Sequence, residues 1–198
     1  MQRLPKMLTT QDLYSLEQYS AQRPAFKSRA VQHRKQRQIQ VGPSVTLHFE
    51  DRLTVQYQIQ EMLLIERTFD QQGIQDELNA YNPLIPTGTN LKATMTIEYS
   101  DPELRAQQLG VLRGIENRVY VKVAAHQPVY AIADEDLERS NDVKTAAVHF
   151  LRFELTPEMI QDLRDQSSAF TVGIDHDAYS YNTRVSGDTR HSLAADLV

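Results

Sequence analysis

Four ionisable residues are the candidates for a functional site in this sequence: Glu66, His149, Asp175 and His176. A glutamate held beside a histidine in apolar surroundings can move a proton, because histidine titrates near neutral pH. Histidine and carboxylate ligands together also bind zinc, iron or manganese. Glu66 and His149 are therefore the candidate catalytic pair, and all four residues are candidate metal ligands. In the alternative interpretation, Glu66 and His149 are core residues that bond to each other or to Arg152.

Glu66 stands out because of its place on a long predicted helix, residues 51–69. On a wheel of about 100° per residue it lies near the centre of an apolar arc. That arc is formed by Val55, Ile59, Met62, Glu66 and Phe69. A carboxylate in such a stripe must be paired, hydrogen-bonded or protonated. The opposite side carries Leu53, Tyr57 and Leu64. We therefore expect this helix to lie between two layers or to form half of a homo-oligomer interface.

His149 is the second ionisable residue that interrupts an apolar pattern, and it lies on a predicted strand, residues 146–155. One face of that strand carries Ala147, His149, Leu151, Phe153 and Leu155. The other face, which includes Phe150 and Arg152, is half apolar, so the alternation leaves open which face is buried. Asp175 and His176 follow the last predicted strand, residues 170–174, and either could be a third member of the site.

The remaining pattern predicts an α+β fold with a mostly antiparallel sheet of about five to seven strands and helices packed on it. The clearest strand is 91–99, whose apolar residues alternate with polar ones that we expect to face water. Other strands are expected at 38–41, 45–49, 118–123, 129–133, 146–155 and 170–174. Helices are expected at 9–21, 24–37, 51–69, 102–112 and from 157, with further turns at the C-terminus. Gly73 is expected to end or kink the long helix.

The cluster Glu50, Asp51 and Arg52 lies where a strand gives way to the long helix. Asp51 is a natural N-cap, and acidic groups there suit the helix dipole. A structural cap is the favoured interpretation. The alternative is a cleft lined by these three residues and Glu61.

The chain is predicted to form one domain, residues 1–198, but its charge is unevenly distributed. Residues 1–40 carry a net charge of +6, whereas the rest carries −11. We expect this basic helical arm to pack on the acidic body, residues 41–198, or to project from it towards an acidic partner. The acidic body argues against nucleic acid as that partner.

Several classes of protein are excluded by what the sequence lacks. It has no cysteine, which excludes disulfides, thiolate nucleophiles and thiolate ligation of iron–sulfur clusters or zinc. No apolar run approaches the ~20 residues that span a bilayer. The start, MQRLPKMLTT, has no apolar stretch or cleavage site, so we expect a cytoplasmic protein. Common metal, nucleotide and hydrolase motifs are absent, including HExxH, Glu-x-x-His, GxGxxG, GxxxxGK[ST] and GxSxG.

Four long stretches resemble a family of bacterial proteins classed as a domain of unknown function. They are FEDRLTVQYQIQEMLLIER, LNAYNPLIPTGTNLKATMTIEY, AIADEDLERSNDVKTAAVHFLRFEL and VGIDHDAY. The resemblance covers nearly the whole chain. It implies a compact bacterial protein whose gene often lies beside rubrerythrin-like proteins and iron–sulfur oxidoreductases similar to a heterodisulfide reductase subunit. It implies no catalytic residue or cofactor.

Two hypotheses of different classes follow. The first is a non-catalytic accessory protein of a redox or peroxide-stress system. It would bind a rubrerythrin-like or iron–sulfur partner through the basic helix 24–37, the acidic stretch 134–142 or the second apolar side of the long helix. The second is a metal-dependent enzyme, or a binder of a metal or small ligand, built on the four candidate residues. The absence of familiar catalytic motifs favours the first.

Overall fold

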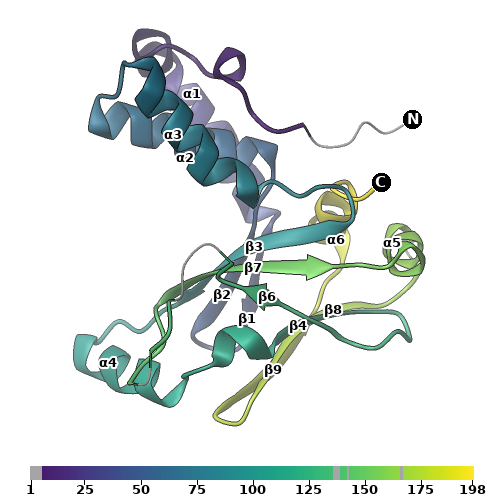
Figure 1. Ribbon diagram of the computed structural model, residues 1–198. Helices are drawn as coiled ribbons and strands as arrows, with labels where there is room; N and C mark the ends of the chain where they lie inside the picture. Colours follow the sequence, from purple (N-terminus) through teal and green to yellow (C-terminus); the bar gives the residue numbers. More distant parts are fainter. Residues whose placement is uncertain (1–5, 136–138, 142, 166) are drawn as a thin grey trace.

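The chain folds into two antiparallel sheets with a layer of helices above them (Figure 1). This computed structural model of the protein describes residues 6–135, 139–141, 143–165 and 167–198. The predicted α+β class and antiparallel pairing are confirmed, although the strands divide between two sheets. No helix in the described parts of the chain is long and apolar enough to cross a membrane.

The first sheet has five strands. In spatial order they are β1 (Gln38–Val41), β2 (Val45–Phe49), β3 (Asn90–Ile97), β7 (Val148–Glu154) and β6 (Ile132–Ala133). The predicted strands 38–41 and 45–49 are confirmed, and they pair as an antiparallel hairpin. Its turn contains Gly42 with a φ of 74°, a left-handed conformation that glycine adopts without steric cost.

The second sheet has four strands. In spatial order they are β5 (Val129–Tyr130), β4 (Val119–Val123), β8 (Phe170–His176) and β9 (Tyr179–Arg184). The predicted strand 129–133 is divided between the sheets, because β5 pairs with β4 whereas β6 pairs with β7. Strand β9 was not predicted.

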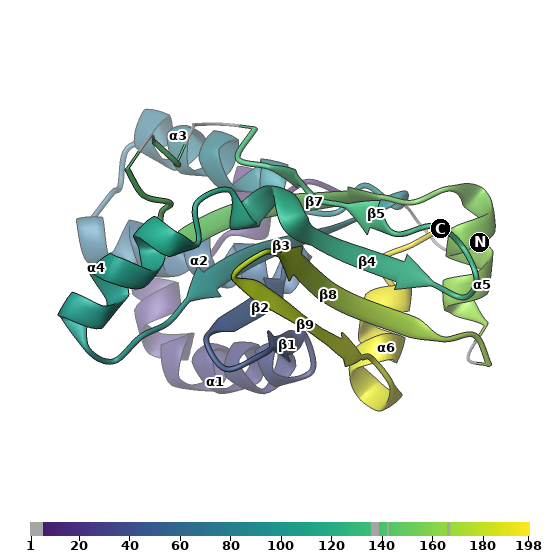
Figure 2. The same ribbon diagram turned by 90° about the horizontal axis from the view of Figure 1, so that it is seen from below.

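The main hydrophobic core lies between the two sheets, which Figure 2 shows from below. Alternation along β3 directs Leu91, Ala93, Met95 and Ile97 into this core, as predicted. Helices α4 (Pro102–Val111), α5 (Pro157–Arg164) and α6 (Gly187–Ala194) add apolar side chains at its ends. The sheets also meet at one edge. There the Tyr179 hydroxyl, from β9, donates a hydrogen bond of 2.8 Å to the carbonyl oxygen of Val41, in β1.

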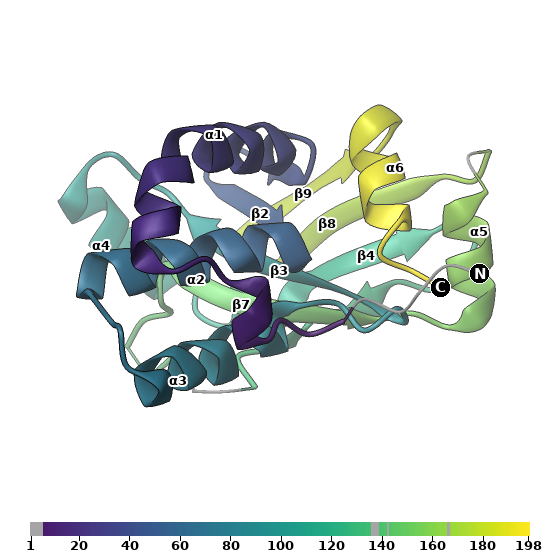
Figure 3. The same ribbon diagram turned by 90° about the horizontal axis from the view of Figure 1, so that it is seen from above.

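The helical layer consists of α1 (Leu16–Lys35), α2 (Arg52–Glu66) and α3 (Gln71–Tyr81), with α2 in the middle (Figure 3). On one side of α2, Val55, Ile59 and Leu63 pack with Leu78 of α3. On the other, Tyr57 packs with Tyr19, Phe26 and Ala30 of α1. The long helix is therefore apolar on two sides because it has a helix on each flank.

Three local predictions about these helices were wrong. The predicted helices 9–21 and 24–37 are a single helix, α1, which is capped by Ser15 and contains Pro24. Where the first helix was expected to begin, a capping box at Thr9 opens only a short 3-10 helix, η1 (Thr10–Asp12). Helix α2 ends at Arg67, whose φ is 54°, and Gly73 lies inside α3 instead of ending the long helix.

The outer face of the five-stranded sheet lies beneath the helical layer (Figures 1 and 3). Its polar residues on β3, Lys92, Thr94 and Thr96, are half-buried, although the alternation predicted that they face water. Thr94 donates a hydrogen bond of 2.8 Å to Glu50, just before α2. Polar contacts therefore join the helices to the sheet here, and the cavity described below lies in the same interface.

Candidate functional site

A cavity of about 630 Å³ lies between the end of α3 and the outer face of the five-stranded sheet. Its upper wall is formed by α3 and the 3-10 helix η2 (Asn82–Leu84), and its floor by β3, β6 and β7. The lining residues are Asn79, Ala80, Tyr81, Pro83, Leu84, Lys92, Ile132, Glu135, Phe150, Leu151 and Arg152. Mostly apolar walls with a few polar groups are typical of small-molecule sites.

Lys92 provides the amine of this cavity. Its Nζ atom donates a hydrogen bond of 2.5 Å to the carbonyl oxygen of Pro83. No carboxylate of a described residue lies within ion-pair distance of Nζ, and an amine has further N–H donors to offer. Burial and the neighbouring charge of Arg152 lower the pKa of Lys92 below its usual value.

Arg152 lies directly opposite Lys92 across the β3–β7 pair. Its guanidinium donates two hydrogen bonds of 2.7 Å to the carboxylate of Glu135, and it also pairs with Glu154. The hydrogen bonds from Arg152 lower the pKa of Glu135. Two cations and two carboxylates therefore meet at this wall, which leaves its net charge close to zero.

His149 is fully buried, as one of the two possible strand faces predicted, but it lies outside this cavity. Its Nδ1 atom lies 2.6 Å from Asp134 Oδ2. Its Nε2 atom lies 2.8 Å from Thr145 Oγ1 and 3.0 Å from the carbonyl oxygen of Ala146. Thr145 in turn donates to the buried carboxylate of Glu116 at 3.0 Å.

Both ring nitrogens of His149 therefore have oxygen partners within hydrogen-bond distance. Asp134 and Glu116 lie next to opposite nitrogens, so the three side chains do not converge on one point. The Thr145 side chain is buried as well. This arrangement is that of a satisfied structural histidine, with no exposed nucleophile and no open ligand position.

The other three candidate residues do not join His149. Glu66 is exposed on the last turn of α2, so the prediction that it lies in the core was wrong. Asp175 pairs with Arg118 at 3.0 Å and accepts a hydrogen bond from Tyr130. The Nε2 atom of His176 lies 3.1 Å from the carbonyl oxygen of residue 113. Among the described residues, no group of three or more histidine and acidic side chains could hold a metal ion.

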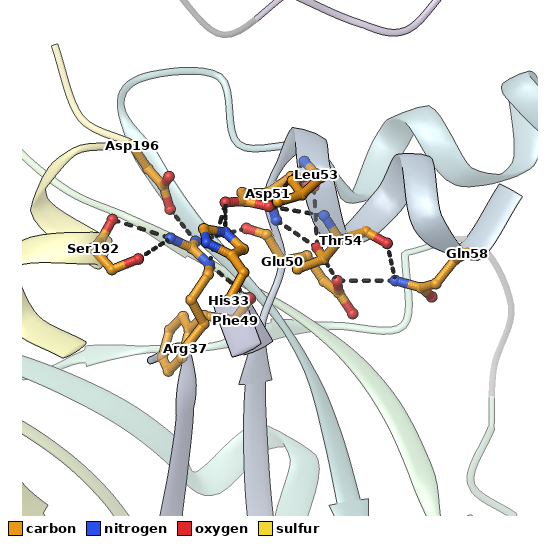
Figure 4. A network of polar contacts seen from close by, with 10 residues as sticks. All are labelled: His33, Arg37, Phe49, Glu50, Asp51, Leu53, Thr54, Gln58, Ser192 and Asp196. Carbon is orange, nitrogen blue, oxygen red and sulfur yellow. Dashed lines mark hydrogen bonds and ion pairs between the residues drawn. The ribbon is translucent and has the colours of Figure 1, made fainter. Parts of the chain in front are cut away.

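A second buried polar network joins the helical layer to the C-terminal helix (Figure 4). Arg37 is 2% exposed. Its guanidinium donates to the carbonyl oxygens of Phe49, Glu50 and Ser192, each at 3.0 Å, and it pairs with Asp196. These contacts connect the end of α1 to β2 and α6.

Two carboxylates of this network have shifted pKa values. Burial raises the pKa of Asp196 to about 6, despite the attraction of Arg37. Burial also acts to raise the pKa of Asp51, but Arg37, the backbone N–H of Thr54 and His33 outweigh it, so this pKa lies below its usual value. Asp51 accepts hydrogen bonds from the backbone N–H groups of Leu53 and Thr54, so its predicted role as the N-cap is confirmed.

The alternative cleft of Glu50, Asp51, Arg52 and Glu61 does not form. Arg52 pairs with Asp12, whereas Glu61 pairs with Arg23 of α1 at 2.8 Å. Glu50 is buried and accepts hydrogen bonds from three neutral side chains, those of Thr54, Gln58 and Thr94. These acidic residues therefore hold the helical layer in place.

Comparison with known proteins identifies the family. A family model described as a protein of unknown function, DUF3501, matches residues 7–197. The chain belongs to the DUF3501 family. It is similar to the crystal structure of a novel protein of unknown function from Burkholderia pseudomallei K96243, with 47% sequence identity and a TM-score of 0.92. The likeness covers 98% of this chain and all of that one. No curated protein matches the chain.

In this DUF3501 protein, the sequence interpretation missed the cavity residues Lys92, Glu135 and Arg152. Alternation places Lys92 and Arg152 on strand faces, but it does not show that a helix covers these faces. A signal was available, because a lysine and an arginine in the middle of apolar strands need a specific environment. Glu135, the partner of Arg152, comes from a loop, and alternation along a strand cannot place a loop residue.

Proposed function

We propose that this protein binds a small, neutral, mostly apolar molecule in the cavity between α3 and the sheet. The observation that carries the proposal is Lys92, a half-buried amine in the cavity wall whose acceptor among the described residues is the carbonyl oxygen of Pro83. Its remaining N–H groups are available to an acceptor on a ligand. This role corresponds to the small-ligand binder considered from the sequence, but at a different place.

The character of the ligand follows from the walls. Leu84, Ile132 and Phe150 offer apolar surface to its body. Because Arg152 is already paired with carboxylates, a charged ligand would disturb a balanced wall, whereas a neutral one would not. An oxygen acceptor such as a carbonyl is the group that suits Lys92.

Calorimetric and NMR titration with 2-heptanone tests the proposal, with heptane-saturated buffer as the comparison. We expect saturable binding of the ketone and shifts of amide signals from β3, β7 and η2. Ala80→Trp, which fills the cavity from α3, should abolish both. Ala106→Trp, at an exposed site on α4, is the matched control and should leave them unchanged. Ketone binding that survives Ala80→Trp would refute the site.

A second candidate is the accessory role in a redox or peroxide-stress system, with a rubrerythrin-like or iron–sulfur protein as partner. It is supported by an exposed apolar area at the end of α2, where Ile65 is 69% and Phe69 73% exposed. Phe69 also lines a shallow hollow with Leu16 and Leu64. Exposed apolar side chains grouped in this way are typical of protein contacts. The acidic stretch 134–142, another predicted contact, lies partly outside the described residues.

A pull-down from the native host under gentle salt tests this role. Recovery of a redox protein with the natural chain, but not with Phe69→Asp, is the expected result. Val31→Asp, on the exposed side of α1, is the control for added charge. Equal recovery with all three proteins, or none with the natural chain, would count against the role.

A further inference from the structure

Lys92 differs from every other lysine of the chain. The sequence contains six lysines, and the other five, Lys6, Lys27, Lys35, Lys122 and Lys144, are exposed. Lys92 is half-buried, lines the cavity and lies directly opposite a second cation, Arg152. A lysine that is desolvated or placed beside another cation is the type that enzymes use as an amine nucleophile.

We propose that Lys92 forms a reversible imine with the carbonyl carbon of a small aldehyde or ketone bound in this cavity, an activity that rests on the ligand binding proposed above. The contacts of Nζ allow it. A neutral amine keeps two N–H groups, so it can retain its hydrogen bond to Pro83 while its lone pair is free to attack. The walls supply a mostly apolar space for the rest of the ligand.

The reaction balances without any oxidant or reductant. The lone pair of Nζ forms a bond to the carbonyl carbon, and a proton moves from nitrogen to oxygen, which gives a carbinolamine. Loss of water then gives the imine, and addition of water reverses both steps. Lys92 is therefore a candidate catalytic residue of this chain.

The surrounding groups favour this chemistry. Burial and Arg152 lower the pKa of Lys92, which raises the share of neutral amine, although Glu135 and Glu154 act in the opposite direction. Tyr81 lines the same cavity. Burial, with the charge of Glu77, raises the pKa of Tyr81, so its hydroxyl stays protonated and can donate a hydrogen bond to a ligand oxygen.

Reductive trapping tests the proposal on the full chain. The protein is incubated with equimolar pentanal and sodium cyanoborohydride at pH 7, and the labelled lysines are identified by peptide mass spectrometry. We expect the peptide containing Lys92 to be labelled at least about tenfold faster than the one containing exposed Lys122, because the cavity holds the aldehyde beside the Lys92 amine. Lys92→Arg should remove the fast phase, and Lys122→Arg should preserve it.

The two proposals fail in distinguishable ways. If 2-heptanone binds without borohydride but Lys92 is labelled no faster than Lys122, the imine is overturned and the binding site stands. If neither binding nor fast labelling occurs, both proposals fall. The comparison of Lys92 with Lys122 is made within the natural protein, so it decides the question even if Lys92→Arg does not fold.

Discussion

The Nδ1 atom of His149 lies 2.6 Å from the Oδ2 atom of Asp134, inside the core. Asp134 also accepts a hydrogen bond of 2.9 Å from the backbone N–H of Phe150, so its two oxygens hold neighbouring groups of β7. On the other side of the ring, Thr145 links His149 to Glu116. The histidine therefore ties the segment before β7 and the 3-10 helix η3 (Ile115–Arg118) to the sheet.

We predict that His149→Ala destabilises the protein by about 3 kcal/mol, because it removes the ring that Asp134 and Thr145 contact and leaves a cavity in the interior. Urea unfolding should show a lower midpoint with an unchanged slope. His176→Ala is the matched control, since His176 is only half-buried, and its effect should stay within about 0.5 kcal/mol. Equal effects of the two substitutions would show that the buried network contributes nothing.

Arg37→Met is predicted to lower the free energy of unfolding by about 3 to 5 kcal/mol, at least as much as His149→Ala does. The guanidinium is the donor to three backbone carbonyls and the partner of Asp196, and methionine can satisfy none of them. Lys35→Met, two residues earlier and exposed, controls for the loss of a positive charge. Circular dichroism during chemical unfolding measures both. A small loss for Arg37→Met would mean that water replaces the missing donor.

The backbone elements of this fold were largely predictable because short-range patterns encode them. Asp51 caps α2 where the sequence indicated, and the alternation in 91–99 predicted β3 and its buried face. Strand β9 was missed because, of its six residues, only Tyr179 is buried. A strand that is exposed along most of its length carries no alternation of apolar and polar residues.

The position of Glu66 could not be obtained from a helical wheel. Helix α2 is covered on both flanks, so its buried stripes are wide and the exposed gap between them is narrow. The wheel also assumed that the helix continues to Phe69, whereas it ends at Arg67. On the observed helix the buried stripe follows Val55, Ile59 and Leu63, and Glu66 falls outside it.

Neither the polar partners of His149 nor the cavity could be predicted from the sequence, for a different reason. Asp134 and Glu116 lie 15 and 33 residues before His149 in the chain, in a loop and a 3-10 helix. The cavity depends on where α3 lies above β3 and β7. Local patterns predict which face of a strand is polar, but they do not predict what covers that face.

Asp196 gives a prediction about pH. Its pKa is raised to about 6, from 3.8, so the folded state holds this proton more tightly than the unfolded state does. The contribution of Asp196 to stability is therefore greatest below pH 4 and decreases as the pH rises towards 6, by roughly 2 to 3 kcal/mol.

Asp196→Asn should remove that dependence. We expect the unfolding free energy of the natural protein, minus that of Asp196→Asn, to fall between pH 4 and pH 6.5. Asp188→Asn, on the exposed side of α6, should show no such trend. A difference that rises with pH would mean that the ion pair with Arg37 outweighs burial.

Removal of metal is predicted to leave the thermal midpoint unchanged, because the carboxylate of Asp175 is already paired with Arg118 and Tyr130. Protein purified without a histidine tag is dialysed against EDTA, and its thermal midpoint is compared before and after. The sequence-based alternative makes the opposite prediction. A midpoint that falls with EDTA, recovers with zinc, iron or manganese, and no longer responds in an Asp175→Ala, His176→Ala double variant would establish a metal site there.

Gly42→Ala is predicted to destabilise the protein more than Gly114→Ala does. Both glycines have left-handed backbone, with φ of 74° and 83°, so both substitutions carry a strain of about 1 kcal/mol. A Cβ atom on Gly42 would also lie 2.6 Å from the ring of Tyr181, whereas one on Gly114 would meet nothing within 4 Å. Movement of that ring should add at least about 1 kcal/mol, measured by urea unfolding of the two variants. Equal losses of unfolding free energy in the two variants would show that the ring of Tyr181 moves aside without a measurable cost in stability.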